Sequence, residues 1–150
     1  MKMSTKGLYA LRLMLDLAIH HSGAYIPLSG ISKRQEISGK YLEQIITPLN
    51  KAGYVKSSRG AQGGYMLAKE PSSYTVGMII RLVEGNLAPV ECVVDNSPAC
   101  HRADFCISKE IWQNVKEAVD NVIDNITLAD LVEKYNQEEF EYANHQTGQY

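Results

Sequence analysis

The sequence lacks any apolar run near the roughly 20 residues that a membrane-spanning helix needs, which excludes the transmembrane class. Arg12 and Asp16 interrupt the apolar stretch 7–19, and no small-residue cleavage site follows it, so we also exclude a secretory signal peptide. Only three of the 150 residues are cysteine. Because disulfides are rare in the cytosol, three cysteines without an export signal predict a cytoplasmic protein.

Residue patterns of catalysis are also missing. The chain has no recognisable nucleophile–base arrangement, phosphate-binding loop or pair of catalytic carboxylates, and its glycines at 60–64 lack the strand–helix context of a nucleotide loop. We therefore do not expect an enzyme. What is present is enough for a fold, since 45% apolar residues can build a core and 21% charged residues argue against wholesale disorder.

The net charge of −2 hides an uneven distribution. Residues 1–69 carry ten Lys or Arg and three acidic residues, a net charge of +7. Residues 70–150 carry five Lys or Arg and fourteen acidic residues, a net charge of −9. A basic half favours a polyanion partner, because each neutralised phosphate releases condensed counterions. The alternative is that oppositely charged halves attract each other within a dimer.

Apolar residues recur at helical spacing three times in the first 53 residues. The predicted helices cover about 5–20, 29–35 and 39–52. Their predicted capping residues are Ser4 or Thr5, Ser29 and Ser38. Gly53 ends the third helix. Pro48 lies inside it and removes a backbone donor, so we expect a kink there or a break into a second short helix.

Two strand-like runs follow, at 54–59 and 65–68, around the glycine-rich turn 60–64. This pattern predicts a β-hairpin. Three short helices followed by a hairpin is the order of a winged helix-turn-helix, in which 29–35 and 39–52 form the helix-turn-helix itself. The predicted fold class is mainly α with a small β-hairpin wing and a long dimerisation helix.

The second helix of a helix-turn-helix lies in the major groove, where base edges differ in donors and acceptors. Gln44 could pair with adenine, Lys40 with guanine or a phosphate, and Glu43 with cytosine. The wing would carry Arg59 into the minor groove, where narrow A·T-rich segments are most negative. The candidate nucleic-acid-binding residues are Ser38, Lys40, Tyr41, Glu43, Gln44, Arg59 and Gly60. The alternative is a protein–protein interaction module in which these residues are only solvated.

The second half begins with a predicted helix at 75–84, capped by Thr75 and ended by Gly85. The pattern of the whole sequence predicts four parts. They are a winged domain at 1–85, a cysteine-bearing sensor loop at 86–106, a dimerisation helix with a short closing helix at 107–135, and a flexible tail at 136–150. The helix at 107–125 carries an apolar seam at Ile111, Val115, Ala118, Val122 and Ile126. Such a seam needs a partner, either the same helix of a second chain or its own domain.

All three cysteines, Cys92, Cys100 and Cys106, fall in the irregular loop. Three thiolates in pliable chain suit a soft metal or an iron–sulfur cluster. The spacing is not the paired C-x₂-C of common zinc modules, so zinc is the less favoured alternative. Candidates for a fourth ligand are Glu91, Asp95, His101, Asp104, Lys109, Asp16, His20, His21 or a residue of a second chain. The cysteines could also be unrelated, or could sense oxidants directly, with His101 and Arg102 lowering the pKa of a thiol.

Over about residues 1–135 the chain resembles the Rrf-two family of bacterial regulators, which includes IscR-type proteins. The resemblance rests on residues 4–11, 37–45, 52–55 and 58–65, the cysteine loop, Trp112 and residues 126–131. It implies a homodimeric DNA-binding transcription regulator, paired through the long helix and bound to a roughly palindromic operator. It also implies a cluster on the three cysteines, [2Fe–2S] in preference to [4Fe–4S], whose state changes DNA affinity.

The chain departs from this family pattern at the fourth ligand. Some cluster-binding relatives have a histidine three residues after the third cysteine, where this chain has Lys109, and others an acidic residue early in the first helix, where it has Leu8. The first interval between cysteines is also longer. Members without a cluster respond through a protein partner or a small molecule, and thiol oxidation is the other cluster-free alternative.

Overall fold

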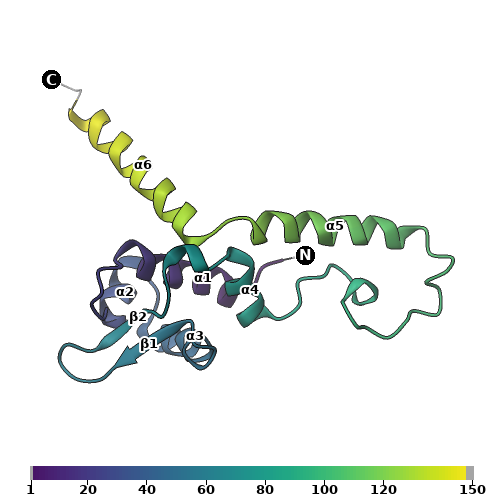
Figure 1. The fold of residues 1–150 in the computed structure, drawn as a ribbon, viewed down its shortest axis with the longest axis horizontal. Helices are drawn as coiled ribbons and strands as arrows, with labels where there is room; N and C mark the ends of the chain where they lie inside the picture. The colour runs from purple at the N-terminus through teal and green to yellow at the C-terminus, as the bar shows by residue number, and fades with distance from the viewer. Residues whose placement is uncertain (1, 148–150) are drawn as a thin grey trace.

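The computed structural model describes residues 2–147. Its elements are α1 (Thr5–Ile19), α2 (Leu28–Gln35), α3 (Gly39–Lys51), β1 (Val55–Ser58), β2 (Gly64–Leu67), η1 (Pro71–Ser73), α4 (Val76–Glu84), η2 (Glu91–Val93), α5 (Ser108–Asp124) and α6 (Leu128–Thr147). The first four helices and the hairpin gather into one body, from which α5 and α6 project in different directions (Figure 1). The body is a winged helix-turn-helix, as the element order predicts.

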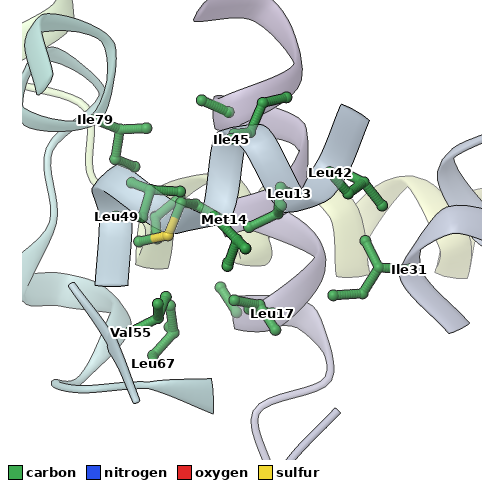
Figure 2. Close-up of a cluster of buried hydrophobic side chains, with 14 of the residues drawn as sticks. Leu13, Met14, Leu17, Ile31, Leu42, Ile45, Leu49, Val55, Leu67 and Ile79 are labelled. Atoms are coloured by element: carbon green, nitrogen blue, oxygen red, sulfur yellow. The ribbon is translucent and has the colours of Figure 1, made fainter. Parts of the chain in front are cut away.

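Helix α1 runs through the middle of this body. Ser4 caps it as expected, since its hydroxyl accepts a hydrogen bond from the Gly7 backbone N–H at 3.3 Å. Its apolar side chains Leu13, Met14 and Leu17 are buried at the centre of the core, where α2, α3, the hairpin and α4 all contribute side chains (Figure 2). Burial of these apolar surfaces from several elements at once holds the helix-turn-helix and the wing in one unit.

Helix α2 begins one residue earlier than predicted, and Ser29 does not cap it. Pro27 is the N-cap residue and makes no side-chain cap, although its carbonyl accepts from the Gly30 N–H at 3.1 Å. The reason lies just upstream. Ile26 pairs with Tyr65 of β2 through hydrogen bonds of 2.7 and 2.8 Å, which keep the chain extended as far as Pro27.

Helix α3 is unbroken from Gly39 to Lys51, so of the two outcomes expected at Pro48 the break into a second short helix is wrong, and a kink there stays a prediction. Ser38 caps it by accepting from the Tyr41 N–H at 3.2 Å, and Gly53 follows it with a φ of +74°, both as predicted. Pro48 lacks a backbone donor, but Ile46 and Leu49 on either side of it are buried in the core. Their packing holds the helix together across the proline.

The wing is a two-stranded antiparallel hairpin with Val55 opposite Leu67 and Ser58 opposite Gly64. Val55 and Leu67 are buried, which fastens the open end of the hairpin to the core. The hydroxyl of Tyr74 donates to the Tyr54 carbonyl at 2.7 Å and accepts from the Lys69 N–H at 3.0 Å. The hairpin therefore projects from a fixed base.

Helix α5 has no buried residue within its bounds. Two kinds of contact attach its C-terminal part to the body. Arg81 of α4 binds Asp120 at 2.5 Å and Asp124 at 2.5 Å. A bridge between Thr75 and Thr127 then joins the start of α4 to the start of α6. The cysteine loop leaves α4, runs alongside α5, where Asp95 lies 3.6 Å from Lys116, and joins α5 at its opposite, N-terminal end (Figure 1).

The predicted loss of structure after residue 135 is wrong for residues 136–147, because α6 continues to Thr147. Leu128 is buried and Leu131 packs against the core, so the first turns of the helix are held in place. The following residues, such as Gln137, Glu138 and Glu139, are strong helix formers and extend it. Residues 148–150 of the predicted tail lie outside the described residues. Between residues 2 and 147, no helix is both long and apolar enough to cross a membrane.

Candidate functional site

The turn of the helix-turn-helix comprises residues 36–38. Glu36 adopts a left-handed conformation with a φ of 55°, which reverses the chain after α2. Ile37 is buried beneath the turn, and the Ser32 hydroxyl donates to the Ile37 carbonyl at 2.5 Å. The buried Ile37 side chain and this side-chain hydrogen bond both help to hold the turn, and α3 starts immediately after it.

One face of α3 is buried and the other is exposed. The buried residues are Leu42, Ile45, Ile46 and Leu49. On the opposite face, Ser38, Lys40, Glu43 and Gln44 are all exposed, while Tyr41 is half-buried. The structure therefore places the predicted DNA-reading residues of α3 on one continuous surface. Their contacts with bases stay predictions.

Thr47 belongs to the same surface and is absent from the predicted set. It is exposed one helical turn beyond Glu43, and its hydroxyl donates to the Glu43 carbonyl at 2.7 Å. Its spacing of three residues from Gln44 is the sequence signal that places it on this face.

The wing tip presents the remaining predicted residues, Arg59 and Gly60, and both are exposed. Gly60 has a φ of +100°, a conformation that L side chains rarely adopt. The Gly63 N–H donates to the Gly60 carbonyl at 3.0 Å, and a Cβ on Gly63 would overlap the Ser58 carbonyl. The glycines are thus needed for the turn itself, and the turn holds Arg59 away from the body.

The three predicted metal ligands are free cysteines. Cys92 and Cys106 are half-buried and Cys100 is exposed. Within residues 2–147, no three His, Cys, Asp or Glu side chains lie close enough together to hold a metal ion. The donor set of three thiols suits an iron–sulfur cluster, but the loop as it stands does not bring the thiols together. A cluster would require the loop to close around it.

Cys106 lies just before α5 and differs from the other two cysteines. The Ser108 hydroxyl, 3.4 Å from its sulfur, lowers the pKa of Cys106 most, although partial burial opposes the effect. The backbone N–H groups of Lys109 and Ser108 and the charge of Arg102 lower the pKa further. These groups increase the fraction of reactive thiolate at this position. The sequence predicts Arg102 as a residue that lowers the pKa of a thiol, but it does not predict this role for Ser108.

Comparison with known proteins decides the family. The family model Rrf2, described as an iron-dependent transcriptional regulator, matches residues 3–134. The chain belongs to the Rrf2 family of transcription regulators. The CymR transcriptional regulator of Bacillus subtilis is 44% identical over 131 residues, covering 87% of this chain and 89% of CymR. The IscR transcriptional regulator of Yersinia enterocolitica is 39% identical over 146 residues, covering 97% of this chain and 87% of IscR.

Solved structures of Rrf2 proteins agree with this assignment. The structure of B. subtilis CymR, described as the global cysteine regulator of that organism, has a TM-score of 0.75 at 42% identity and covers 89% of this chain and 98% of CymR. T. potens IscR has a TM-score of 0.73 at 44% identity, with 90% and 88% of the two chains covered. The winged helix-turn-helix fold and a role in transcription regulation are therefore shared with these relatives, which are named as transcriptional regulators.

Proposed function

We propose that this Rrf2 protein is a homodimer that binds a specific duplex operator and whose DNA affinity is set by the state of Cys92, Cys100 and Cys106. The observation that carries the DNA-binding part is the single exposed polar surface of α3 beside a wing that extends Arg59. This surface lies in the basic part of the chain, where residues 1–69 have a net charge of +7. Helix α3 would enter the major groove, and Arg59 the minor groove.

The homodimer is supported by the unpaired apolar face of α5. Ala118, Val119, Val122 and Ile123 together line a shallow apolar depression on this helix. Val122 is 59% exposed and Ile111 is 58% exposed, which is unusual for such side chains. The same helix of a second copy would cover both. Two recognition helices held about one turn of DNA apart would then fit a palindromic site.

Control through the cysteines rests on their place in the fold. Cys92, Cys100 and Cys106 would supply three thiolates to an iron–sulfur cluster, with [2Fe–2S] preferred over [4Fe–4S] and the fourth ligand unassigned. Such a cluster would supply sensitivity to oxygen, nitric oxide or iron supply. The loop joins α4 of the winged domain to α5, and Asp95 in the loop lies 3.6 Å from Lys116 of α5. Ordering the loop would therefore act on the spacing of the two winged domains.

A cluster-free mechanism is the second candidate, and it rests on Cys106, whose sulfur lies 3.4 Å from the Ser108 hydroxyl directly before α5. A thiolate at the start of α5 would react with an oxidant and disturb the same junction. A protein partner or a small molecule could bring about the same change. The relation to a protein described as a global cysteine regulator is compatible with such a mechanism.

The deciding experiment has a chemical and a functional part. Iron, zinc and acid-labile sulfide are measured per chain on protein purified without oxygen, together with the visible spectrum. Iron and sulfide in matching amounts indicate a cluster, zinc alone indicates a structural metal, and neither indicates thiol, partner or ligand sensing. The affinity for a duplex selected from a random-sequence library is then measured with and without air, for the wild type and for the triple Cys→Ala variant.

We expect air to change the affinity of the wild type and not that of the triple variant. An air response that survives in the triple variant would contradict control through the cysteines. The absence of any salt-dependent affinity for duplex DNA would instead indicate a protein–protein module. For the dimer, Val122→Asp should give monomers in sedimentation, whereas Asn121→Asp, an equal charge change at the neighbouring exposed residue, should not.

A further inference from the structure

One row of α1 side chains contacts both sides of the helix-turn-helix turn. Tyr9, Arg12 and Asp16 lie three and four residues apart, so they share a face of the helix. This face meets the end of α2 and the start of α3. Helix α1 is outside the helix-turn-helix, and none of these residues belongs to the predicted DNA-contacting set.

The contact with α3 is aromatic. The Tyr9 and Tyr41 rings meet edge to face, with centroids 5.8 Å apart and planes at 81°. Arg12 lies over the Tyr9 ring, with its guanidinium carbon 5.2 Å from the centroid. Both geometries are favourable for the ring quadrupole. Arg12 thus holds the Tyr9 ring in position, and the Tyr9 ring in turn holds the first turn of α3 in position through Tyr41.

The contact with α2 is made of hydrogen bonds. Arg12 Nε donates to Gln35 Oε1 at 3.1 Å, and Arg12 Nη2 donates to the Gln35 carbonyl oxygen. Gln35 is the last residue of α2, and its Nε2 donates to Asp16 Oδ2 at 3.0 Å. The guanidinium of Arg12 therefore joins the end of α2 to the aromatic pair that holds α3.

We propose that Tyr9 and Arg12 are positioning residues for DNA recognition, because they brace the turn between Gln35 and Tyr41 and so set the orientation of α3. The proposal rests on the proposed function, in which α3 reads bases. Base hydrogen bonds weaken steeply with small errors of distance and angle, whereas attraction to phosphates does not. Loss of the brace should therefore reduce sequence discrimination and leave non-specific binding unchanged.

The test compares two duplexes of equal length, one selected by the wild-type protein from a random-sequence library and one of unrelated sequence. We expect Tyr9→Leu and Arg12→Lys each to weaken binding to the selected duplex about tenfold, the size of one good base contact. Binding to the unrelated duplex and the salt slope should not change. Reselection with the Tyr9→Leu variant should give a relaxed preference at the base pairs that face the first turn of α3.

Two further variants make the result decisive. Tyr9→Phe keeps the ring and should bind like the wild type, and Tyr142→Leu changes an exposed tyrosine of α6 and should also have no effect. Equal weakening on both duplexes would overturn the proposal, and so would a Tyr9→Phe defect as large as that of Tyr9→Leu, which would indicate a direct contact. Arg12→Lys keeps the charge and supplies the same test if Tyr9→Leu does not fold. If the wild type binds neither duplex, the proposed function itself fails.

Discussion

Arg34 of α2 donates two hydrogen bonds to the carboxylate of Asp16 on α1. Its Nη2 donates to Oδ1 at 2.7 Å and its Nε donates to Oδ2 at 3.1 Å. Among residues 2–147, Asp16 is the one buried charged residue, with 1% of its side chain exposed, whereas Arg34 is 38% exposed. The hydrogen bonds with Asp16 raise the pKa of Arg34, against a smaller effect of burial.

Arg34→Met should therefore destabilise the protein, because it leaves Asp16 buried with fewer partners. We expect the free energy of unfolding to fall by about 2 kcal/mol, at the lower end for a charged hydrogen-bonded pair because Arg34 reaches solvent. Urea unfolding measures the change. Lys33→Met, an equal change at the exposed neighbouring residue, is the control, and equal stability of the two variants would contradict the role given to Arg34.

The stability that the Arg81–Asp120 contact between α4 and α5 contributes should depend on pH. Burial raises the pKa of Asp120, but hydrogen bonds from Arg81 and Lys116 outweigh it and hold the pKa below its ordinary value. A carboxylate with a lowered pKa stabilises the fold fully above its unfolded pKa of about 3.9, and the stabilisation is lost as the pH falls through the folded value. Asp120→Asn should thus be less stable than the wild type at neutral pH, with a difference that shrinks below about pH 4.

The measurement for Asp120 is the free energy of unfolding as a function of pH. The exposed Asp104 provides the control, since Asp104→Asn should differ little from the wild type over the same range. A stability difference for Asp120→Asn that stays constant into strong acid would contradict the ionic origin of the contact.

Substitutions of Lys40 and Arg59, the two cationic residues of the predicted DNA-binding set, should affect DNA affinity in different ways. Lys40→Ala should lower the affinity and reduce the slope of log affinity against log salt by about 1, because one phosphate contact is lost. Arg59→Ala should weaken binding most at sites with an A·T-rich minor groove. Titrations at several salt concentrations on matched duplexes test both. Lys134→Ala, an exposed cation of α6, is the control, and variants of Lys40 and Arg59 that both bind like the wild type would refute this docking.

The second half of α6 should be visible in solution as helix. Phe140 is 69% exposed, so Phe140→Pro should break the helix without disturbing the core. We expect the helical circular dichroism signal to fall while the thermal midpoint moves little. Phe140→Ala removes the same ring but keeps the helix, and it should retain the signal. Equal spectra for the two variants would mean that residues 136–147 are not helical.

The sequence predicts the winged body well because its elements are marked locally. Ser4, Ser38 and Thr75 cap the helices that they were expected to cap, and Gly53 and Gly85 end theirs. The errors occur where neighbouring structure decides. Pairing of Ile26 with β2 moves the start of α2, and buried side chains around Pro48 keep α3 whole. Apolar periodicity missed the end of α6 because that part is extended by helix propensity rather than by packing.

The candidate site is predictable to a smaller extent. The exposed face of α3 follows from helical spacing, so Lys40 and Gln44 fall where they were expected. The contact of Tyr9 with Tyr41 joins residues 32 positions apart, and only the packing of α1 reveals it. Clustering of the cysteines in sequence likewise does not determine their distances in space, which depend on the path of an irregular loop.

The contacts of α5 with the winged body lie near one end of the helix, so this helix can act as a lever. Arg81 holds it at Asp120 and Asp124, and the bridge at Thr127 fixes the chain just beyond it, so the fulcrum is at the C-terminal end. The 17-residue helix is about 25 Å long, and Cys106 precedes its far end. A rotation of a few degrees at the fulcrum is magnified at the cysteine end. Under the proposed control through the cysteines, a displacement of the chain at Cys106 would turn α5 about its contact with Arg81 of the winged body.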